Sequence, residues 1–191
     1  TFSTALYSVA AGAGNDTVTG TAGADWIQGN SGADRLFGLD GNDSLLGDIG
    51  ADHLTGGNGN DMLIAGHGND RIDGGFGRDT ILLGGGNDIA YGGAQNDTLH
   101  GNDGANQMYG GDGNDRLYSG RAGSSLFGDA GDDTLFADLR LTGHSLSGGA
   151  GADSFVFNGL VNGVVTRSVI TDFDRAEDRL IVEGRSINLD A

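Results

Sequence analysis

Aspartate is the residue type in this chain whose number and spacing could carry chemistry. Of the 27 acidic residues only Glu177 and Glu183 are glutamate, so 25 are aspartate. Twelve of these recur at multiples of nine residues between Asp16 and Asp133. Stacked carboxylates repel one another unless a cation lies between them, and Ca²⁺ is a hard ion that takes six to eight oxygen ligands. The spacing therefore indicates cation binding.

The aspartates belong to a nine-residue repeat that keeps one register over residues 11–136. These 126 residues divide into 14 units without insertion or deletion, and GGNGNDMLI is one of them. Position four is glycine in all but two units, which carry Gln95 and Ala122. Position six is aspartate in all but two, which carry Asn106 and Ser124. Position eight is apolar throughout, so each unit predicts a tight glycine turn followed by a short strand with one inward side chain.

This unit resembles the nonapeptide GGxGxDxUx of the RTX family of secreted calcium-binding proteins, and the resemblance covers all of residues 11–136. It implies an all-β fold, the right-handed parallel β-roll or β-helix, in which two units complete one coil of 18 residues. The 14 units then predict about seven coils. A core only one side chain thick from each sheet is too thin to hold such a fold alone.

In such a roll, residues 18 apart stack, and the position-six residues form two ladders, one on each edge. One ladder consists of Asp25, Asp43, Asp61, Asp79, Asp97, Asp115 and Asp133, and continues after a two-residue insertion to Asp153. The other consists of Asp16, Asp34, Asp52, Asp70 and Asp88, and continues through Asn106, Ser124 and His144. We expect the aspartates to be metal ligands. By resemblance, carbonyls of the position-four turns complete the coordination shell, which adds Gly14, Gly23, Gly32, Gly41, Gly50, Gly59, Gly68, Gly77, Gly86, Gly113 and Gly131.

The number of stacked aspartate pairs predicts the number of ions. Six pairs lie on the first ladder up to Asp133 and four on the second up to Asp88, which predicts about ten Ca²⁺ ions. Occupancy is expected to be asymmetric, with weak or absent metal around Asn106 and Ser124. The alternative interpretation is a solvated acidic face. Without metal, a chain with a formal net charge of −17 and few large apolar residues is expected to be disordered, so that metal binding and folding are one event.

Composition excludes several classes of partner and suggests a compartment. A net charge of −17 excludes nucleic acid, because phosphate binding requires a basic surface. The sequence contains no run of about 20 apolar residues, so no membrane span is predicted. The chain has no cysteine. The chain begins with Thr1, and residues 1–10 lack the basic region of a signal peptide. We therefore expect part of a longer protein that is secreted or held at the cell surface, by type I secretion as the resemblance implies.

The chain is expected to divide into four segments. They are an N-terminal strand or linker at 1–10, fourteen repeats at 11–136, a degenerate and a final repeat at 137–156, and a C-terminal β cap at 157–191. The stretch GGAGADSFVF and the later SVITDFDRAEDRLIV resemble the C-terminal cap of serralysin-type proteases and alginate-epimerase R-modules. Strands are predicted there at 155–157, 169–173 and 180–182.

Two segments are similar to known functional motifs, an EF-hand calcium loop and the nucleophile elbow of lipases. In TDFDRAED the spacing of Asp172, Asp174 and Asp178 is similar to the start of an EF-hand, but the glycine and the downstream glutamate of that loop are absent. An Arg-paired surface turn is the favoured interpretation. The segment GHSLSGG resembles a nucleophile elbow, but no helix is predicted after it. The four histidines are scattered and are expected at the surface, so the chain is not expected to be an enzyme.

Position nine should point outward but is apolar in many units. It carries Leu46, Ile64, Leu82, His100, Tyr118 and Phe136 on one sheet and Phe37, Tyr91, Tyr109 and Phe127 on the other. Stacked rings can simply stabilise a sheet, or the stripe can dock the other domains of a parent protein or a polysaccharide. The leading hypothesis is a calcium-triggered folding module of a larger secreted protein. The alternative is a module that binds carbohydrate or a cell surface.

Overall fold

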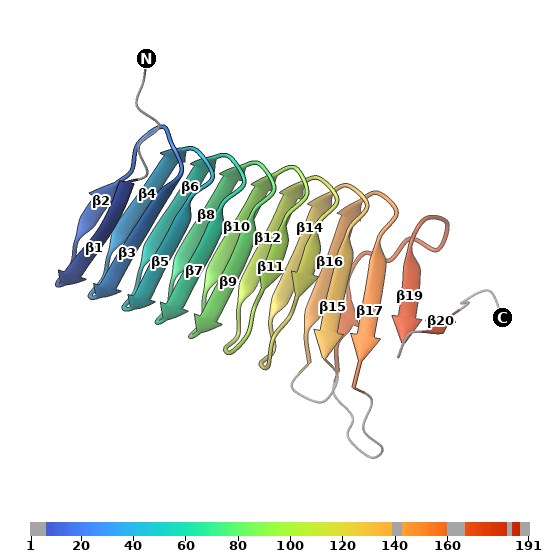
Figure 1. Ribbon diagram of the computed structural model, residues 1–191. Helices are drawn as coiled ribbons and strands as arrows, with labels where there is room; N and C mark the ends of the chain where they lie inside the picture. The colour runs from blue at the N-terminus through green and yellow to red at the C-terminus, as the bar shows by residue number, and fades with distance from the viewer. Residues whose placement is uncertain (1–6, 139–142, 160–166, 183–184, 188–191) are drawn as a thin grey trace.

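The computed structural model describes residues 7–138, 143–159, 167–182 and 185–187, which form two β-sheets and no helix. The first sheet contains, in spatial order, β1 (Tyr7–Ala13), β3 (Asp25–Ser31), β5 (Ser44–Ile49), β7 (Met62–His67), β9 (Thr80–Gly85), β11 (Thr98–His100), β13 (Arg116–Tyr118), β15 (Thr134–Asp138), β17 (Ser154–Asn158), β19 (Arg179–Val182) and β20 (Arg185–Ile187). The second contains β2 (Thr17–Thr19), β4 (Arg35–Asp40), β6 (His53–Asn58), β8 (Arg71–Phe76), β10 (Ile89–Ala94), β12 (Gln107–Asp112), β14 (Ser125–Ala130), β16 (Ser145–Ala150) and β18 (Val169–Ile170). Odd and even strands alternate along the chain, so the chain winds from one sheet to the other (Figure 1).

Strands pair in parallel with an offset of 18 residues, as the repeat predicts. Leu45 lies beside Leu63 in the first sheet, and Leu36 lies beside Leu54 in the second. The two-residue insertion changes the offset once in each sheet, so that Thr134 pairs with Ser154. The result is a parallel β-solenoid of about eight turns of about 18 residues, which confirms the predicted β-roll.

Most strands are longer than the three residues expected from the sequence. A typical strand has six residues and runs from position seven of one unit to position three of the next, as in Arg35–Asp40. Its second and fourth residues are buried, which correspond to positions eight and one. The turn is therefore confined to about three residues, because the glycine pair at positions one and two continues the backbone ladder, as at Gly57 and Gly75.

The core is a single file of side chains from each sheet. Position-eight residues such as Ile27, Leu63 and Leu117 are fully buried, and in a few units position one adds Ala65 or Leu83. Because each coil contributes so few apolar side chains, this core gives the roll shape but limited stability.

The C-terminal end is closed by short strands. β17, β18 and β19 match the three predicted segments, although β18 has only two residues. β20 pairs with β19 in antiparallel fashion, which the sequence did not predict. Phe173 lies against Phe155 with ring centroids 5.9 Å apart and packs on the end of the core. At the other end, β1 pairs with β3 as a covering strand, while residues 1–6 of the predicted N-terminal strand or linker lie outside the described residues. The described part of the chain contains no helix that could cross a membrane.

Candidate metal centre

The turns form two rows, one along each edge of the solenoid (Figure 1). Turns from the second sheet back to the first carry Asp25, Asp43, Asp61, Asp79, Asp97, Asp115, Asp133 and Asp153. We call this row the glycine edge, because position one of its units is always glycine. Turns from the first sheet to the second carry Asp16, Asp34, Asp52, Asp70, Asp88, Asn106, Ser124 and His144, and this row is called the mixed edge. The structure thus places every predicted aspartate in one of the two expected ladders.

One carboxylate oxygen of each rung holds the backbone of the preceding coil. The backbone N–H of Asp43 donates to Oδ1 of Asp61 at 2.7 Å, and that of Asp61 donates to Oδ1 of Asp79 at 2.8 Å. The ladder crosses the insertion, because the N–H of Asp133 donates to Oδ1 of Asp153 at 2.9 Å. Buried backbone donors must be paired, so Oδ1 of the interior rung aspartates has a structural role.

The other carboxylate oxygen of most rung aspartates has no partner in the protein. Among the described residues, a buried Oδ2 without a hydrogen bond occurs in Asp16, Asp34, Asp43, Asp52, Asp61, Asp70, Asp79, Asp88, Asp97, Asp115 and Asp133. All of these side chains except Asp16 are buried. A buried carboxylate that lacks a partner is costly, so each of these oxygens needs either a proton or a cation.

In most of these coils a glycine at position one lies beside the unpartnered oxygen. A Cβ added to Gly38 would lie 2.3 Å from Oδ2 of Asp43 and 2.6 Å from the carbonyl oxygen of Gly56. At Gly110 the corresponding distances to Oδ2 of Asp115 and to the carbonyl oxygen of Gly128 are 2.3 and 2.6 Å. Only glycine therefore fits at position one of these coils, and the two oxygens lie together beside it in a cradle of the oxygen ligands that Ca²⁺ accepts.

Position one distinguishes the two edges, which the sequence reasoning missed. On the glycine edge the residue five before each rung aspartate is glycine without exception, from Gly20 to Gly148. On the mixed edge the same position carries Ala11, Ala65, Leu83 and Ser119 in four coils. The signal was present in the sequence but becomes visible only when the units are sorted by edge. The cradle is therefore complete along the glycine edge and interrupted along the mixed edge.

Position four requires glycine because successive turns approach closely there. Gly59 has a φ of 136°, and a Cβ on it would lie 1.5 Å from the carbonyl oxygen of Gly41. A side chain on Gly59 would therefore force these two coils apart. Two units carry Gln95 and Ala122 at this position instead, and Gln95 adopts a φ of 79°, so its turn accepts a strained residue and keeps its shape. The position-four glycines thus pack the turns, and their role as carbonyl ligands remains a prediction.

Burial disfavours the charged form of the rung carboxylates. Desolvation raises the pKa of Asp43, Asp52, Asp61, Asp70, Asp79 and Asp115 to about 6, of Asp133 to about 7 and of Asp97 to about 8. Neighbouring carboxylates raise several of these pKa values further, and the Oδ1 hydrogen bonds lower them. A bound divalent cation would stabilise the charged form instead.

The first and last rungs of the glycine edge differ from the interior ones. At the start, Thr21 donates its backbone N–H to Oδ2 of Asp25 at 2.5 Å. Most other position-two residues have a positive φ, including Asn30 and Asp48, but Thr21 does not, because a β-branched side chain disfavours that region. At the other end, the N–H of Asp153 donates to Oδ1 of Asp178 at 3.0 Å, so the ladder extends one rung beyond the predicted one.

The aspartates of TDFDRAED have backbone partners. Within the described ranges, none of them forms an ion pair with arginine, so the predicted Arg-paired turn is wrong. Asp172 accepts the N–H of Gly148 and of Gly149 at 3.0 Å, and the hydroxyl of Ser147 at 2.6 Å. Oδ2 of Asp178 accepts the N–H of Asp174 at 2.8 Å. This segment therefore closes the last coil with hydrogen bonds.

A comparison with protein families agrees with these features. The RTX calcium-binding nonapeptide repeat, of hemolysin type, matches the chain in four copies at residues 11–45, 46–81, 83–117 and 109–139. The chain belongs to the RTX calcium-binding repeat family. The comparison does not extend to the C-terminal cap, whose similarity to those of proteases and epimerases stays a prediction. No curated protein matches the chain.

The residues of this RTX roll fit calcium binding. In the described ranges no three His, Cys, Asp or Glu side chains converge on one point. Each turn instead offers the carboxylate oxygens of one rung and backbone carbonyls, which are the oxygen ligands that Ca²⁺ accepts. RTX repeats imply calcium binding, and proteins with such repeats are typically secreted.

The aromatic residues at position nine are stacked on one another. The ring centroids of His100 and Tyr118 are 4.4 Å apart with planes 7° apart, and Tyr118 and Phe136 are 4.4 Å apart at 4°. On the other sheet Tyr91, Tyr109 and Phe127 form a similar stack. Each inner ring therefore has both faces covered, which supports the interpretation that these rings stabilise the sheets.

The described residues of the RTX roll do not assemble a catalytic site around the serines of GHSLSGG. GHSLSGG lies in and before β16, and the described chain beyond it contains no helix to form an elbow. Of the four histidines, His144 is only 2% exposed, so the predicted surface location is wrong for this residue. It occupies a rung of the mixed edge because the turn register places it there.

Proposed function

We propose that this RTX roll binds several Ca²⁺ ions between successive turns, mainly along the glycine edge, and folds as it binds them. The observation that carries this proposal is the row of buried Oδ2 atoms without partners. On the glycine edge the row runs without a break from Asp43 to Asp133, and each of its carboxylates faces a position-one glycine cradle. The predicted total of about ten ions includes four aspartate pairs on the mixed edge, where cradles are interrupted. We therefore expect the glycine edge to be filled first.

The proposed ligands of each ion are carboxylate oxygens of two successive rungs and carbonyls of the turns. Asp43 and Asp61 illustrate one pair, in which Oδ2 of Asp43 and the carbonyl oxygen of Gly56 point to the same space. The position-four carbonyls, such as that of Gly41, lie in the same turns and can supply further oxygens. Because each coil contributes one carboxylate to an edge, an isolated turn lacks the second carboxylate of a calcium site. That carboxylate is in place only after the next coil has formed.

We infer that this coupling serves export of a larger protein. A chain with a net charge of −17 that folds only with metal would remain unfolded where calcium is scarce and would fold outside the cell. Extracellular calcium modules work at about 10⁻⁴ to 10⁻³ M, which fits such a switch. In this view, the roll stabilises the secreted protein and assists type I secretion, its partners are the protein's other domains, and the four segments are one cooperative unit with a C-terminal cap.

Far-UV circular dichroism during a Ca²⁺ titration tests the proposal, with Mg²⁺ as the control. We expect a cooperative transition from disordered chain to β-structure near millimolar Ca²⁺. Mg²⁺ should produce none, because it requires short octahedral bonds and loses its water reluctantly. A β-spectrum that persists in excess chelator at pH 8 would contradict the proposal.

A second candidate, binding of carbohydrate or of a cell surface, is favoured by a groove of about 500 Å³ over β11, β13 and β15. The edges of the stacked rings line it, together with the polar side chains of Asn102, Arg121 and Asn158. Such a mixture of rings and polar groups is typical of ligand pockets. Because the rings hold the sheet, the polar residues are the better targets for substitution.

A glycan array with the calcium-loaded protein and with the double variant Arg121→Ala/Asn158→Ala separates this function from the first. Binding by the native chain that is lost in the variant, with unchanged thermal stability, would support a carbohydrate site. Absence of glycan binding by the native chain would leave calcium-dependent folding as the function.

A further inference from the structure

The mixed edge keeps its ladder beyond the last aspartate, although the residues there carry no carboxylate. The N–H of Asp88 donates to Oδ1 of Asn106 at 2.9 Å, and the N–H of Asn106 donates to Oγ of Ser124 at 3.1 Å. Ser124 in turn donates its N–H to Nδ1 of His144, and His144 donates its N–H to Oγ of Ser168, both at 3.1 Å. Four neutral groups therefore take the place of the aspartate Oδ1 as acceptors of the backbone N–H groups along this edge. They are Oδ1 of Asn106, Oγ of Ser124, Nδ1 of His144 and Oγ of Ser168.

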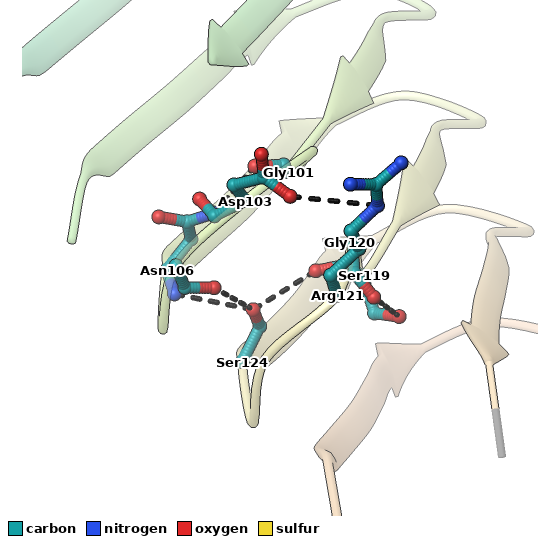
Figure 2. Close-up of polar contacts among 8 residues, drawn as sticks. Gly101, Asp103, Asn106, Ser119, Gly120, Arg121 and Ser124 are labelled. Carbon is teal, nitrogen blue, oxygen red and sulfur yellow. Dashed lines mark hydrogen bonds and ion pairs between the residues drawn. The ribbon is translucent and has the colours of Figure 1, made fainter. Parts of the chain in front are cut away.

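The side-chain donors of Asn106 and Ser124 are also hydrogen-bonded. Nδ2 of Asn106 donates to the carbonyl oxygen of Gly101 at 2.6 Å. The hydroxyl of Ser124 donates to the carbonyl oxygen of Ser119 at 2.9 Å, and Figure 2 shows this side chain between Asn106 and Ser119 on successive turns. Gly101 and Ser119 both stand at position one. In the aspartate coils the position-one carbonyl of the next coil lies near the unpartnered Oδ2, as that of Gly56 lies near Asp43, and no side-chain donor stands between these two acceptors.

A side-chain donor therefore does in these coils what a cation is proposed to do elsewhere. Asn106 and Ser124 are each only 1% exposed, yet neither retains a buried polar side-chain atom without a partner. A cation at this point would meet N–H and O–H groups instead of free oxygens. The Oγ of Ser119 lies 3.4 Å from Nε2 of His144, which extends the hydrogen-bonded network to the next coil.

From this geometry we propose that the column Asn106, Ser124, His144 and Ser168 is a calcium-independent staple that replaces the metal along the mixed edge of the C-terminal coils. The inference rests on the proposed function, because it assumes that the aspartate rungs are held by calcium. The ring stacks of both sheets run through the same coils, from Tyr91 to Phe136. These coils consequently depend less on calcium than the coils before them.

Restoring the carboxylates tests this inference. The double variant Asn106→Asp/Ser124→Asp replaces both donors by acceptors, so it is expected to bind at least one additional Ca²⁺ per chain in equilibrium dialysis. At the calcium midpoint of the native chain, hydrogen exchange in β12 and β14 should become at least tenfold faster in the variant. At saturating calcium the two proteins should exchange alike. The matched control is Asp97→Asn/Asp115→Asn, on the glycine edge of the same coils, which should bind fewer ions.

A second variant covers the case in which the restored carboxylates prevent folding. Asn106→Ala/Ser124→Ala removes the donors without adding charge, and should accelerate exchange in β12 and β14 at every calcium concentration while the number of bound ions stays the same. An unchanged ion count in the aspartate variant, or unchanged exchange in the alanine variant, would overturn the staple while leaving calcium binding intact. A native chain that binds no calcium would instead overturn the proposed function.

Discussion

At the scale of single residues, the two oxygens of each rung aspartate have different tasks. Oδ1 accepts a backbone N–H of the preceding coil, and Oδ2 is buried without a partner. An asparagine can accept the backbone N–H, as Asn106 does. Because it carries no charge, it cannot offer an anionic oxygen to a cation. The two tasks can therefore be separated by substitution.

We predict that Asp79→Asn retains the roll but loses calcium affinity. Its Oδ1 would still accept the N–H of Asp61, while the charge beside Gly74 would be lost. Stability at saturating calcium should fall by about 1–3 kcal/mol, and the midpoint of a calcium titration followed by circular dichroism should rise. Asp112→Asn, at an exposed position, removes the same charge and serves as control; equal effects of the two substitutions would contradict the assignment.

Position-one glycine should be as sensitive as the aspartate itself. A Cβ in Gly56→Ala would lie 2.4 Å from Oδ2 of Asp61 and 2.6 Å from the carbonyl oxygen of Gly74. Overpacking of this kind costs about 1–3 kcal/mol, and the methyl group would displace two oxygens that are proposed as calcium ligands. Gly85→Ala is the matched control because its Cβ meets only His67, at 3.3 Å. Thermal unfolding in calcium should show a lower Tm for the first variant alone.

At the scale of elements, the sequence predicted strands and stacking correctly because both follow from a period of nine. Position eight had to face inward, and residues 18 apart had to stack, as Leu45 and Leu63 do. Strand length was underestimated because glycine pairs such as Gly56 and Gly57 were interpreted as turn, although their backbone continues the ladder. Composition alone does not reveal whether a glycine bends the chain or extends it.

The cap and the ends of the ladders were less predictable. Asp178 follows Asp153 by 25 residues, so no period identifies it as a rung, and its role depends on how the last coil folds back. Oδ2 of Asp25 accepts a hydrogen bond from the backbone N–H of Thr21, which does not have the positive φ of other position-two residues. This is a local conformational effect. Such features arise from three-dimensional contacts that a repeat pattern does not encode.

The ring stacks predict a stability effect at the level of the sheet. Tyr118 lies between His100 and Phe136, so Tyr118→Leu keeps apolar surface but removes two ring contacts. Each aromatic pair contributes about 0.5–1.5 kcal/mol beyond burial, so the free energy of unfolding in calcium should fall by about 1–3 kcal/mol. Ile64→Leu, at the same repeat position but without ring neighbours, should change it little. Equal stability of the two variants in chemical denaturation would refute the contribution of the stack.

At the scale of the whole molecule, calcium and protons compete for the same carboxylates. In the metal-free roll the pKa of the interior rungs is about 6 to 8, above the unfolded value of about 3.9. The folded state therefore binds more protons than the unfolded state, and its stability rises as the pH falls from 8 toward 4. Below the unfolded pKa no further gain is expected.

This linkage predicts opposite pH effects with and without calcium. In chelator, circular dichroism should show β-structure increasing on acidification from pH 8 to pH 4. In calcium, the concentration at the folding midpoint should increase as the pH falls through the range of the raised pKa values, because protons displace the metal. A midpoint that does not change between pH 8 and pH 5 would show that the buried carboxylates are not the calcium ligands.

The position of the ions is the most direct test of the account. Crystals grown in calcium and measured for anomalous scattering would show each bound ion as a separate peak. We predict a continuous row of peaks along the glycine edge, between successive rungs from Asp43 to Asp153, and none beside Asn106 or Ser124. Peaks distributed equally over both edges, or absent from the space beside the position-one glycines, would contradict the central claim that carboxylate and glycine together form the calcium site.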